Sequence, residues 1–409
     1  MKVPCESVTV DRMTTQPTTR QIFRDAIRRL DPAKPVAGEH ESGWYVPCVA
    51  RKLDIVGRLS LDTTAKLALV GSVGTGKSTE LLYAQRHLNA LPDVLAVYVD
   101  VPSLVRLNED LPSRIVGAMI ATSIQQLQST EAPKSELTAI EAAVAPYLHG
   151  DWSFLRALSV GPGLEQLGRG FLPGVLIPPL PLPEWAINAV SEIRSLAIRS
   201  LGKELVCLFD GLDRLPKNLD FVDAFTPVSQ LCAQLGVGYC VVCPLEAAFG
   251  VKRLAFQEVA HRLESLLPVQ PTDLLSFLRT LLHSRELEHL FEPDASVVLC
   301  HTSGGIIRDM IQLCRESLQL AFADGSETVR ERHALQAADS LGRSMMIGVL
   351  NEELLSLRHA TKVPNFTPRT STDLNLIATK RLIEVREGLR TRYEVHPALL
   401  PFIVQEQAS

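Results

Sequence analysis

Gly71-Ser-Val-Gly-Thr-Gly-Lys-Ser78 decides the fold of this chain, because it matches the pattern G-x-x-x-x-G-K-[ST] at every fixed position. The segment before it, Lys66–Val70, is typical of a buried parallel strand, and residues 78–88 have the apolar spacing of a helix. Glycines let the backbone curl around phosphate oxygens, so that successive N–H groups point inward at the helix N-terminus. Strand, loop and helix together predict a phosphate-binding site.

The loop also carries the side chains that a nucleoside triphosphate and its metal ion need. Lys77 can reach the β- and γ-phosphates, and the hydroxyl of Ser78 can bind magnesium. We therefore expect ATP and Mg²⁺ as cofactors. The predicted nucleotide-binding residues of the loop are Gly71, Ser72, Val73, Gly74, Thr75, Gly76, Lys77, Ser78 and Thr79.

A second apolar run, Leu205-Val-Cys-Leu-Phe-Asp-Gly-Leu-Asp-Arg214, ends in two carboxylates. Its apolar residues predict a strand that is buried on both faces, as in a parallel sheet. Asp210, at the end of this strand, can hold magnesium through its water shell. Asp213 can orient or deprotonate the attacking water. The other interpretation is an ordinary turn, since Asp-Gly is common turn chemistry.

Length and composition indicate a globular chain with ample core. The chain has 409 residues, which is enough for two or three domains. Hydrophobic residues make up 46% and charged residues 21%, so the chain is not of the disordered class. The net charge of -5 gives no overall basic signal, so contact with nucleic acid would need a local patch.

The cysteines and the N-terminus fit a cytoplasmic protein. The first residues lack the apolar region of a signal peptide, and most of the eight cysteines lie inside apolar runs. Cys240 and Cys243 have the spacing of a zinc pair. They fall in a predicted strand, however, where residues i and i+3 point to opposite faces, so we expect no metal site there.

An apolar, proline-rich insertion at about 150–187 is the one segment that could be mistaken for a membrane span. Five prolines at 170–187 break any helix and remove backbone donors. We expect an extended surface segment that packs on its own domain. The other interpretations are that the segment covers the surface of a partner protein or contacts a membrane. Of these, we do not predict membrane association.

The order of elements predicts an α/β fold with a doubly wound parallel sheet. Strand-like runs at 66–70, 94–100, 205–209, 237–243 and 265–269 alternate with helical segments. We expect a P-loop NTPase core at 45–270, preceded by an extension at 1–44 that contains one helix at 18–30. After Pro271 the pattern is helical only, which predicts a lid at 271–345.

The last part of the chain, 346–409, has a different pattern. Residues 351–358 and 372–380 have helical patterns, and 381–396 alternate apolar and polar residues around Glu387-Gly388. Such alternation on either side of a short turn predicts a β-hairpin. Helices followed by a hairpin are the outline of a winged-helix domain.

These motifs, in this order, resemble the AAA+ and STAND ATPases over roughly residues 45–400. Asp210-Gly-Leu-Asp213 is similar to the D-G-L-D-E form of NACHT-type signalling ATPases, although Arg214 stands where that form has Glu. Gly304-Gly-Ile-Ile-Arg308 resembles the G-x-x-R element of the family's lid, whose arginine touches the γ-phosphate from the same subunit. The alternative for Arg308 is a solvated helix arginine.

The resemblance implies further residues around the nucleotide. Arg262 is the candidate for an arginine finger, with Arg253 as the alternative; such a finger acts on a neighbouring subunit and implies a homo-oligomer. Tyr45 and Val46, in the segment Trp44–Pro47, stand where the family contacts adenine, although ordinary packing is the alternative. Cys243-Pro244 replaces the polar sensor that normally follows the fourth strand, which implies slow or conditional hydrolysis.

Three functions compete on this basis. The first is a regulatory ATPase whose nucleotide state controls self-assembly and an effector protein, because Gly76-Lys-Ser-Thr-Glu-Leu81 also resembles bacterial ATPases linked to phage defence. The second is a DNA-acting ATPase of the origin-binding or transposition type. The third is a nucleotide-binding scaffold with little hydrolysis. DNA binding is expected to be weak, because Glu384, Glu387 and Glu394 interleave with the arginines of the hairpin.

Overall fold

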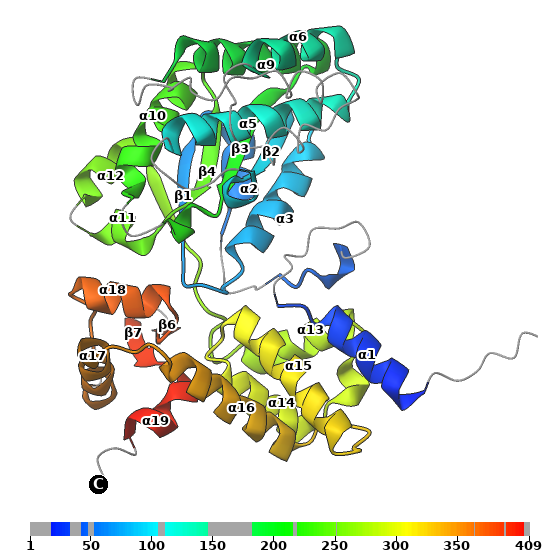
Figure 1. Ribbon diagram of the computed structural model, residues 1–409, viewed down its shortest axis with the longest axis vertical. Coiled ribbons are helices and arrows are strands. Elements are labelled where there is room, and N and C mark those ends of the chain that lie inside the picture. Colours follow the sequence, from blue (N-terminus) through cyan, green and yellow to red (C-terminus); the bar gives the residue numbers. More distant parts are fainter. Residues whose placement is uncertain are drawn as a thin grey trace, which may run out of the picture.

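The computed structural model separates the chain into a half built on a sheet and a helical half below it (Figure 1). The structure describes residues 18–32, 42–47, 53–104, 111–145, 182–215, 219–250, 252–363, 365–387 and 390–404. The greater part of the proline-rich insertion predicted at 150–187 lies outside these residues.

The sheet half contains five parallel strands. They are β1 (Lys66–Val70), β2 (Val94–Asp100), β3 (Glu204–Asp210), β4 (Gly238–Val242) and β5 (Arg262–Ser265). Their order across the sheet is β2-β3-β4-β1-β5, so β4 is inserted between β1 and β3. The phosphate loop follows β1, Asp210 ends β3 and Asp213 comes just after it, and parallel strands bring the loop and the acids to the same edge of the sheet.

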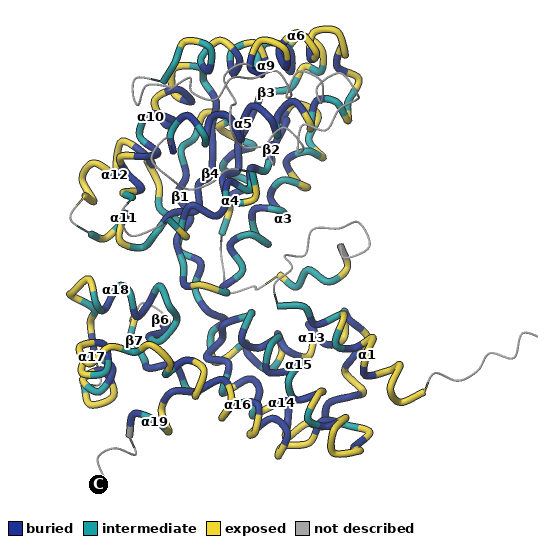
Figure 2. Tube along the Cα trace, viewed as in Figure 1, coloured by how far each residue is buried: buried dark blue, intermediate teal, exposed yellow. Residues whose placement is uncertain are grey.

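Helices cover both faces of the sheet, which confirms the doubly wound fold. One face packs against α2 (Ile55–Leu61) and α3 (Lys77–Asn89). The other carries α5 (Leu111–Gln128), α6 (Lys134–Val144), α9 (Glu184–Leu201), α10 (Phe221–Gln234) and α12 (Arg253–Val259), with the short α4 (Val101–Leu104) and α11 (Leu245–Phe249) near the strand ends. Figure 2 shows the strands as the most continuously buried part of the molecule.

Two expectations about strand geometry are resolved by the sheet. Cys240 packs in the apolar cluster on the α3 side and Cys243 in the cluster on the other side, so their side chains point to opposite faces as predicted. The strand expected at 265–269 is wrong, because β5 pairs with β1 only from Arg262 to Ser265. Pro268 lacks the N–H that a longer ladder would need. Arg262 therefore lies within the last strand and not before it.

The helical half begins with a four-helix lid. Its helices are α13 (Leu274–Ser284), α14 (Pro293–Thr302), α15 (Ile307–Ala323) and α16 (Glu331–Met346), with a short turn η4 (Glu288–Leu290). Helix α1 (Thr19–Arg29) belongs to the same core, since Phe23 and Ala26 are buried in the apolar cluster of the lid. The N-terminal helix thus packs against lid helices that lie far from it in the sequence.

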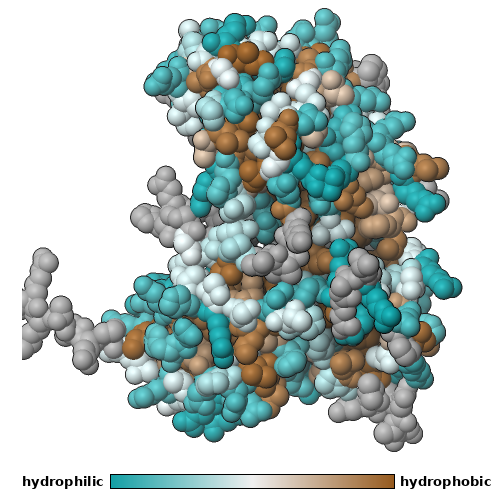
Figure 3. Space-filling model, turned by 180° about the vertical axis from the view of Figure 1, so that it is seen from behind, coloured by the Kyte–Doolittle hydropathy of each residue, from teal (hydrophilic) through white to brown (hydrophobic). Residues whose placement is uncertain are grey.

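The C-terminal part is a winged-helix arrangement. It consists of α17 (Asn351–Lys362), α18 (Ser371–Ala378), the antiparallel hairpin β6 (Leu382–Glu387) and β7 (Arg390–Val395), η5 (Pro397–Leu399) and α19 (Leu400–Val404). It shares the apolar cluster of the lid, to which Leu376 and Leu399 contribute. The rear view in Figure 3 shows apolar and polar side chains interspersed over both halves. Within the described ranges, no helix has the length and hydropathy that a bilayer crossing requires.

Candidate nucleotide-binding site

The phosphate loop takes the shape that its glycines allow. Gly74 has φ of 90° and Gly76 has φ of 102°, both in the left-handed region that side chains other than glycine rarely adopt. Helix α3 begins directly after Gly76. The N–H groups of its first turn have no partners within the helix, so they form a positive end suited to an anion.

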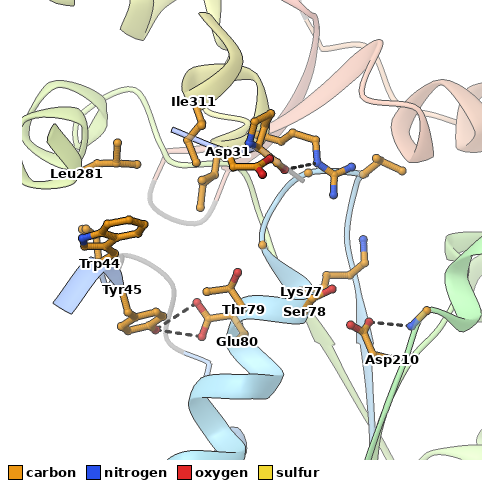
Figure 4. A pocket seen from close by; sticks show the side chains of 18 of the residues that line it. Asp31, Trp44, Tyr45, Lys77, Ser78, Thr79, Glu80, Asp210, Leu281 and Ile311 are labelled. Carbon is orange, nitrogen blue, oxygen red and sulfur yellow. Dashed lines mark hydrogen bonds between the residues drawn. The ribbon is translucent and has the colours of Figure 1, made fainter. Parts of the chain in front are cut away.

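A cavity of about 250 Å³ lies in front of this loop, between the sheet edge, the lid and the N-terminal segment. Figure 4 shows that its two ends differ in character. Lys77, Ser78 and Asp210 lie together at one end, whereas Trp44, Leu281 and Ile311 lie at the other. The polar end suits phosphates and a metal ion, and the aromatic and aliphatic end suits a base.

The side chain of Lys77 is buried at the polar end, and its ammonium group contacts oxygen atoms of Gly71, Ser72 and Asp213. Its Nζ donates to the carbonyl oxygens of Gly71 at 2.7 Å and Ser72 at 3.1 Å. The same atom lies 3.0 Å from Oδ2 of Asp213, which sits on the short turn η3 (Leu212–Arg214) after β3. The predicted second acid is therefore in the site, paired with the lysine of the loop.

Asp210 is held at both carboxylate oxygens. Its Oδ1 accepts a hydrogen bond of 2.7 Å from the N–H of Gly211, and its Oδ2 accepts one of 2.6 Å from the hydroxyl of Tyr98. Burial and the neighbouring Asp210 raise the pKa of Tyr98, so the phenol keeps its proton and remains a donor. Gly211 is in the left-handed region, with φ of 81°.

Sequence reasoning missed a third acid at the same edge. Asp100 ends β2 opposite Asp210 in the strand register and lines the cavity. Burial and the charge of Asp210 raise its pKa. Tyr98 and Asp100 could have been found by one signal, namely that ligands in parallel sheets bind at the carboxyl ends of the strands.

The lid supplies Arg308 to the cavity wall. Its backbone N–H donates to the carbonyl of Gly74 at 3.1 Å, and its Nε donates to that of Pro32 at 3.3 Å. Burial and the nearby Arg214 lower the pKa of this guanidinium. Arg308 therefore lies in the wall of the cavity, between the loop and the N-terminal segment. Its contact with a phosphate stays a prediction.

The predicted adenine segment lines the other end of the cavity. The ring of Tyr45 stacks on Tyr83 of α3 with centroids 4.4 Å apart, and its hydroxyl donates to Glu80. Val46 lies in the wall beside it. Trp44 is covered by the guanidinium of the buried Arg285, 5.4 Å from its ring centroid. Aromatic and charged groups therefore surround the space in which a base would lie.

Not every predicted residue lines the cavity. Val73, Gly74, Gly76, Lys77, Ser78 and Thr79 do so, whereas Gly71, Ser72 and Thr75 have structural contacts instead. A Cβ at Gly71 would lie 2.6 Å from the carbonyl oxygen of Leu266, and the hydroxyl of Thr75 donates to the backbone carbonyl oxygen of Ser72. These three residues shape the loop.

The two candidate fingers lie away from the cavity of their own subunit. Arg262 is half-exposed on the edge strand β5, and its Nε donates to Glu264 at 2.8 Å. It stands beside Leu67, near the start of β1, whereas the phosphate loop follows the other end of that strand. Arg253 begins α12 and is exposed. Neither residue is among those that line the cavity.

The residues at the polar end fit a magnesium ion. The hydroxyl of Ser78 and the carboxylate of Asp210 are oxygen ligands, which this hard cation prefers, and both line the cavity. Asp210 is nearly buried yet has no lysine or arginine paired with it in the described contacts. A cation at this position would supply the missing counter-charge.

Comparison with known proteins extends to structure alone, since neither a family model nor a curated protein matches the sequence. A Walker-type ATPase of Pyrococcus abyssi is 14% identical, with a TM-score of 0.50 over 92% of this chain and 99% of that one. The Aeropyrum pernix ORC2 protein, in ADPNP–ADP complexes, is 14% identical, with a TM-score of 0.47 over 93% and 98%. The fold is therefore that of a P-loop NTPase with an α-helical lid and a C-terminal winged-helix domain.

Proposed function

We propose that this chain is an AAA+/STAND-type regulatory ATPase, which binds and hydrolyses ATP with Mg²⁺. One observation carries the proposal: Lys77, Ser78, Asp210 and Asp213 converge at one end of a single cavity, and the lid closes over it with Arg308. The motif predicts two of these residues to bind phosphate and metal. The acids after β3 add the groups that hydrolysis needs.

The described contacts suggest how the residues divide the work. The N–H groups at the start of α3 and the ammonium of Lys77 bind the phosphates. Phosphate oxygens then replace the partners of Lys77, which frees Asp213 to accept a proton from the attacking water. Ser78 and Asp210 hold Mg²⁺, which neutralises phosphate charge when bound. Arg308 adds positive charge from the lid.

Slow hydrolysis is part of the proposal. Cys243 follows β4 at the position where a polar side chain would contact the nucleotide. It is buried, and burial raises the pKa of its thiol well above the usual value, so it remains neutral. A neutral thiol is a weak hydrogen-bond donor. The site thus lacks one group that would speed the reaction.

The phosphate loop is connected to both parts of the helical half. Its Gly74 carbonyl accepts from the N–H of Arg308 in the lid, and its Val73 N–H donates to the carbonyl of Ala378 in the winged helix at 3.0 Å. A change in the loop on nucleotide binding therefore alters both contacts. This supports control of self-assembly and of an effector protein by nucleotide state. A role in bacterial antiphage defence rests on the sequence resemblance alone.

The basic residues of the C-terminal hairpin do not favour the DNA-acting alternative. Arg386 pairs with Glu384 at 3.0 Å, and Arg392 pairs with Glu394 at 2.6 Å. Lys380 pairs with the buried Asp309. Phosphate neutralisation needs available cations, so these ion pairs reduce what the hairpin can offer to a duplex.

Binding of a fluorescent ATP analogue with Mg²⁺ tests the proposal. Lys77→Ala should weaken binding at least about tenfold, which is about 1.4 kcal/mol, because it removes the cation of the loop. Lys203→Ala is the matched control, since Lys203 lies beside the start of β3, at the opposite edge of the sheet. Equal binding by Lys77→Ala and the parent protein would refute the nucleotide site, and an absence of phosphate release would favour the scaffold.

Self-association tests the regulatory part. Light scattering should show larger particles with a slowly hydrolysed ATP analogue than with ADP. Arg262→Ala should lower phosphate release without weakening nucleotide binding, because the finger acts on a neighbouring subunit. If Arg253 is the finger instead, Arg253→Ala should lower phosphate release and Arg262→Ala should not. A monomer with both nucleotides would contradict this part of the proposal.

A further inference from the structure

Tyr98 occupies an unusual place on an otherwise apolar strand. Strand β2 reads Val-Leu-Ala-Val-Tyr-Val-Asp, and Tyr98 is its one residue with a hydroxyl. The ring packs in the apolar cluster between the sheet and α3, so it lies on the same face as the helix that begins at the phosphate loop. Its hydroxyl therefore emerges at the carboxyl edge of the sheet, inside the cavity.

The hydroxyl of Tyr98 contacts Asp210, one of the two predicted magnesium ligands. It donates to Oδ2 of Asp210 at 2.6 Å, and Ser78 lines the same cavity. Ser78 comes from the first turn of α3 and Asp210 from the end of β3. The phenol thus fixes one of the two ligands that a bound metal ion would have to join.

The register of the sheet explains why Tyr98 can reach Asp210. Tyr98 stands beside Leu208 on β3, two positions before Asp210. A phenol is long enough to extend from that row to the end of the neighbouring strand. Two torsions position the whole side chain, so the packed ring loses little freedom when its hydroxyl bonds.

We propose that Tyr98 is a positioning residue for the metal half of the site. Its hydroxyl holds the Asp210 carboxylate, together with the N–H of Gly211, so that the acid and Ser78 face the same ion. The carboxylate keeps lone pairs for a metal-bound water, because each oxygen accepts only one of these hydrogen bonds. This inference rests on the proposed function, since it concerns the Mg²⁺ that accompanies ATP.

The chain offers a matched control for the loss of a tyrosine hydroxyl. Tyr239 is fully buried on β4, and its hydroxyl donates to Ser229 at 2.7 Å. Tyr239 does not line the cavity. Tyr239→Phe therefore removes a buried hydroxyl from the same sheet without touching the predicted metal ligands.

The test measures affinity for a fluorescent ATP analogue across a range of Mg²⁺ concentrations. In Tyr98→Phe the Mg²⁺ concentration that gives half of the full affinity should rise about fivefold or more, because a hydrogen bond to a charged group is lost. Affinity in the presence of a chelator should stay within about twofold of the parent, since the phosphate loop is intact. Thermal unfolding of each variant shows whether the fold is kept.

A second comparison separates positioning from general stability. In the background of Asp210→Ala, Tyr98→Phe should have no further effect on the Mg²⁺ dependence, since the carboxylate that it positions is gone. An unchanged Mg²⁺ dependence in Tyr98→Phe, or an equal shift in Tyr239→Phe, overturns the inference alone. A parent protein that binds no nucleotide overturns the proposed function and the inference together.

Discussion

The sheet half and the junction between the lid and the winged helix are held together differently. The sheet packs between two apolar clusters, in which Phe209, Tyr239 and Leu69 are fully buried. The junction also has apolar contacts, but it adds charged groups that water does not reach. Asp309 is completely buried, forms an ion pair with Lys380 and faces the buried His396 across 3.4 Å.

This difference shows what each region can tolerate. Apolar packing weakens gradually as groups move apart, and volume-conserving changes are tolerated. A buried charge that loses its partner is costly at once, because it cannot regain water. The junction therefore depends on a few residues in a defined arrangement. Asp309, the buried carboxylate of this junction, directly follows Arg308 on α15. Because Arg308 lines the nucleotide cavity, the junction borders that cavity.

Removal of the buried carboxylate should have the largest effect on stability. Asp309→Ala leaves Lys380 and His396 without their partner, and we expect a loss of about 3 kcal/mol in the free energy of unfolding. The matched control is Asp339→Ala, which breaks an exposed i,i+4 pair with Arg343 and should cost far less. Denaturant unfolding measures both, and equal losses would contradict the comparison.

The same carboxylate gives a pH dependence of known sign. Burial alone would raise the pKa of Asp309, but His396 and Lys380 outweigh it, so the pKa is lowered in the folded protein. A lowered folded pKa contributes stability above the ordinary value of 3.8, and the contribution is lost as the pH falls through the folded value. As the pH falls through this range, the free energy of unfolding should therefore decrease more for the parent protein than for Asp309→Ala.

Removal of the second acid should have the next largest effect, on turnover. Asp213→Asn keeps the phosphate loop and should leave ATP bound, but phosphate release should fall about 100-fold, because the base that accepts the proton is lost. Asp210→Ala should additionally weaken the Mg²⁺ dependence of binding. If Asp213→Asn releases phosphate at the rate of the parent, Asp213 is not the base.

A smaller effect is expected where the loop meets the lid. In Gly74→Ala the new Cβ would lie 2.8 Å from Cβ of Arg308 and 3.1 Å from Cγ2 of Ile306, at φ of 90°. We expect a loss of about 1–2 kcal/mol in stability from strain and displacement of the lid. Gly202→Ala has a similar positive φ but open space around its Cβ, so it isolates the strain. Equal losses would show that contact with the lid contributes nothing.

The smallest effect is expected at the hairpin. Arg392 is already paired with Glu394, and Arg390 is exposed on the same strand. Arg390→Glu/Arg392→Glu should therefore change duplex binding little, because we expect the parent to bind DNA at most weakly and without sequence preference. A salt titration measures this. Tight binding by the parent at physiological salt, with collapse in the double variant, would support the DNA-acting alternative.

Local patterns in the sequence predicted the elements of the fold well. The run Lys66–Val70, the strand Val94–Asp100 and the helix Leu111–Gln128 occur as expected, because apolar periodicity follows from burial within each element. The start of β5 was misplaced, since the apolar residues after Ser265 continue the strand pattern while their backbone leaves the sheet. The periodicity of apolar residues indicates which residues are buried, but it does not indicate which residues pair with a neighbouring strand.

The site was predictable only where a motif is continuous in sequence. The loop 71–78 and the acids after β3 were found in this way. The hydroxyl of Tyr98 and the ion pair of Asp309 with Lys380 join residues that lie far apart in the chain, and composition gives no sign of them. Such contacts depend on strand register and domain docking, which a single sequence leaves open.

The hydrogen bond between Val73 and Ala378 joins residues that are synthesised at very different times. Chains leave the ribosome from the N-terminus, and domains generally fold in that order. The sheet half can close its apolar core before the winged helix has been made. Helix α1 must instead wait for the lid, since Phe23 is buried in the apolar cluster of the lid with its ring centroid 5.7 Å from that of Phe322 on α15. The first helix of the chain thus docks only after the lid has been made, and the cavity, whose wall includes Arg28 and Arg29 of this helix, is complete only then.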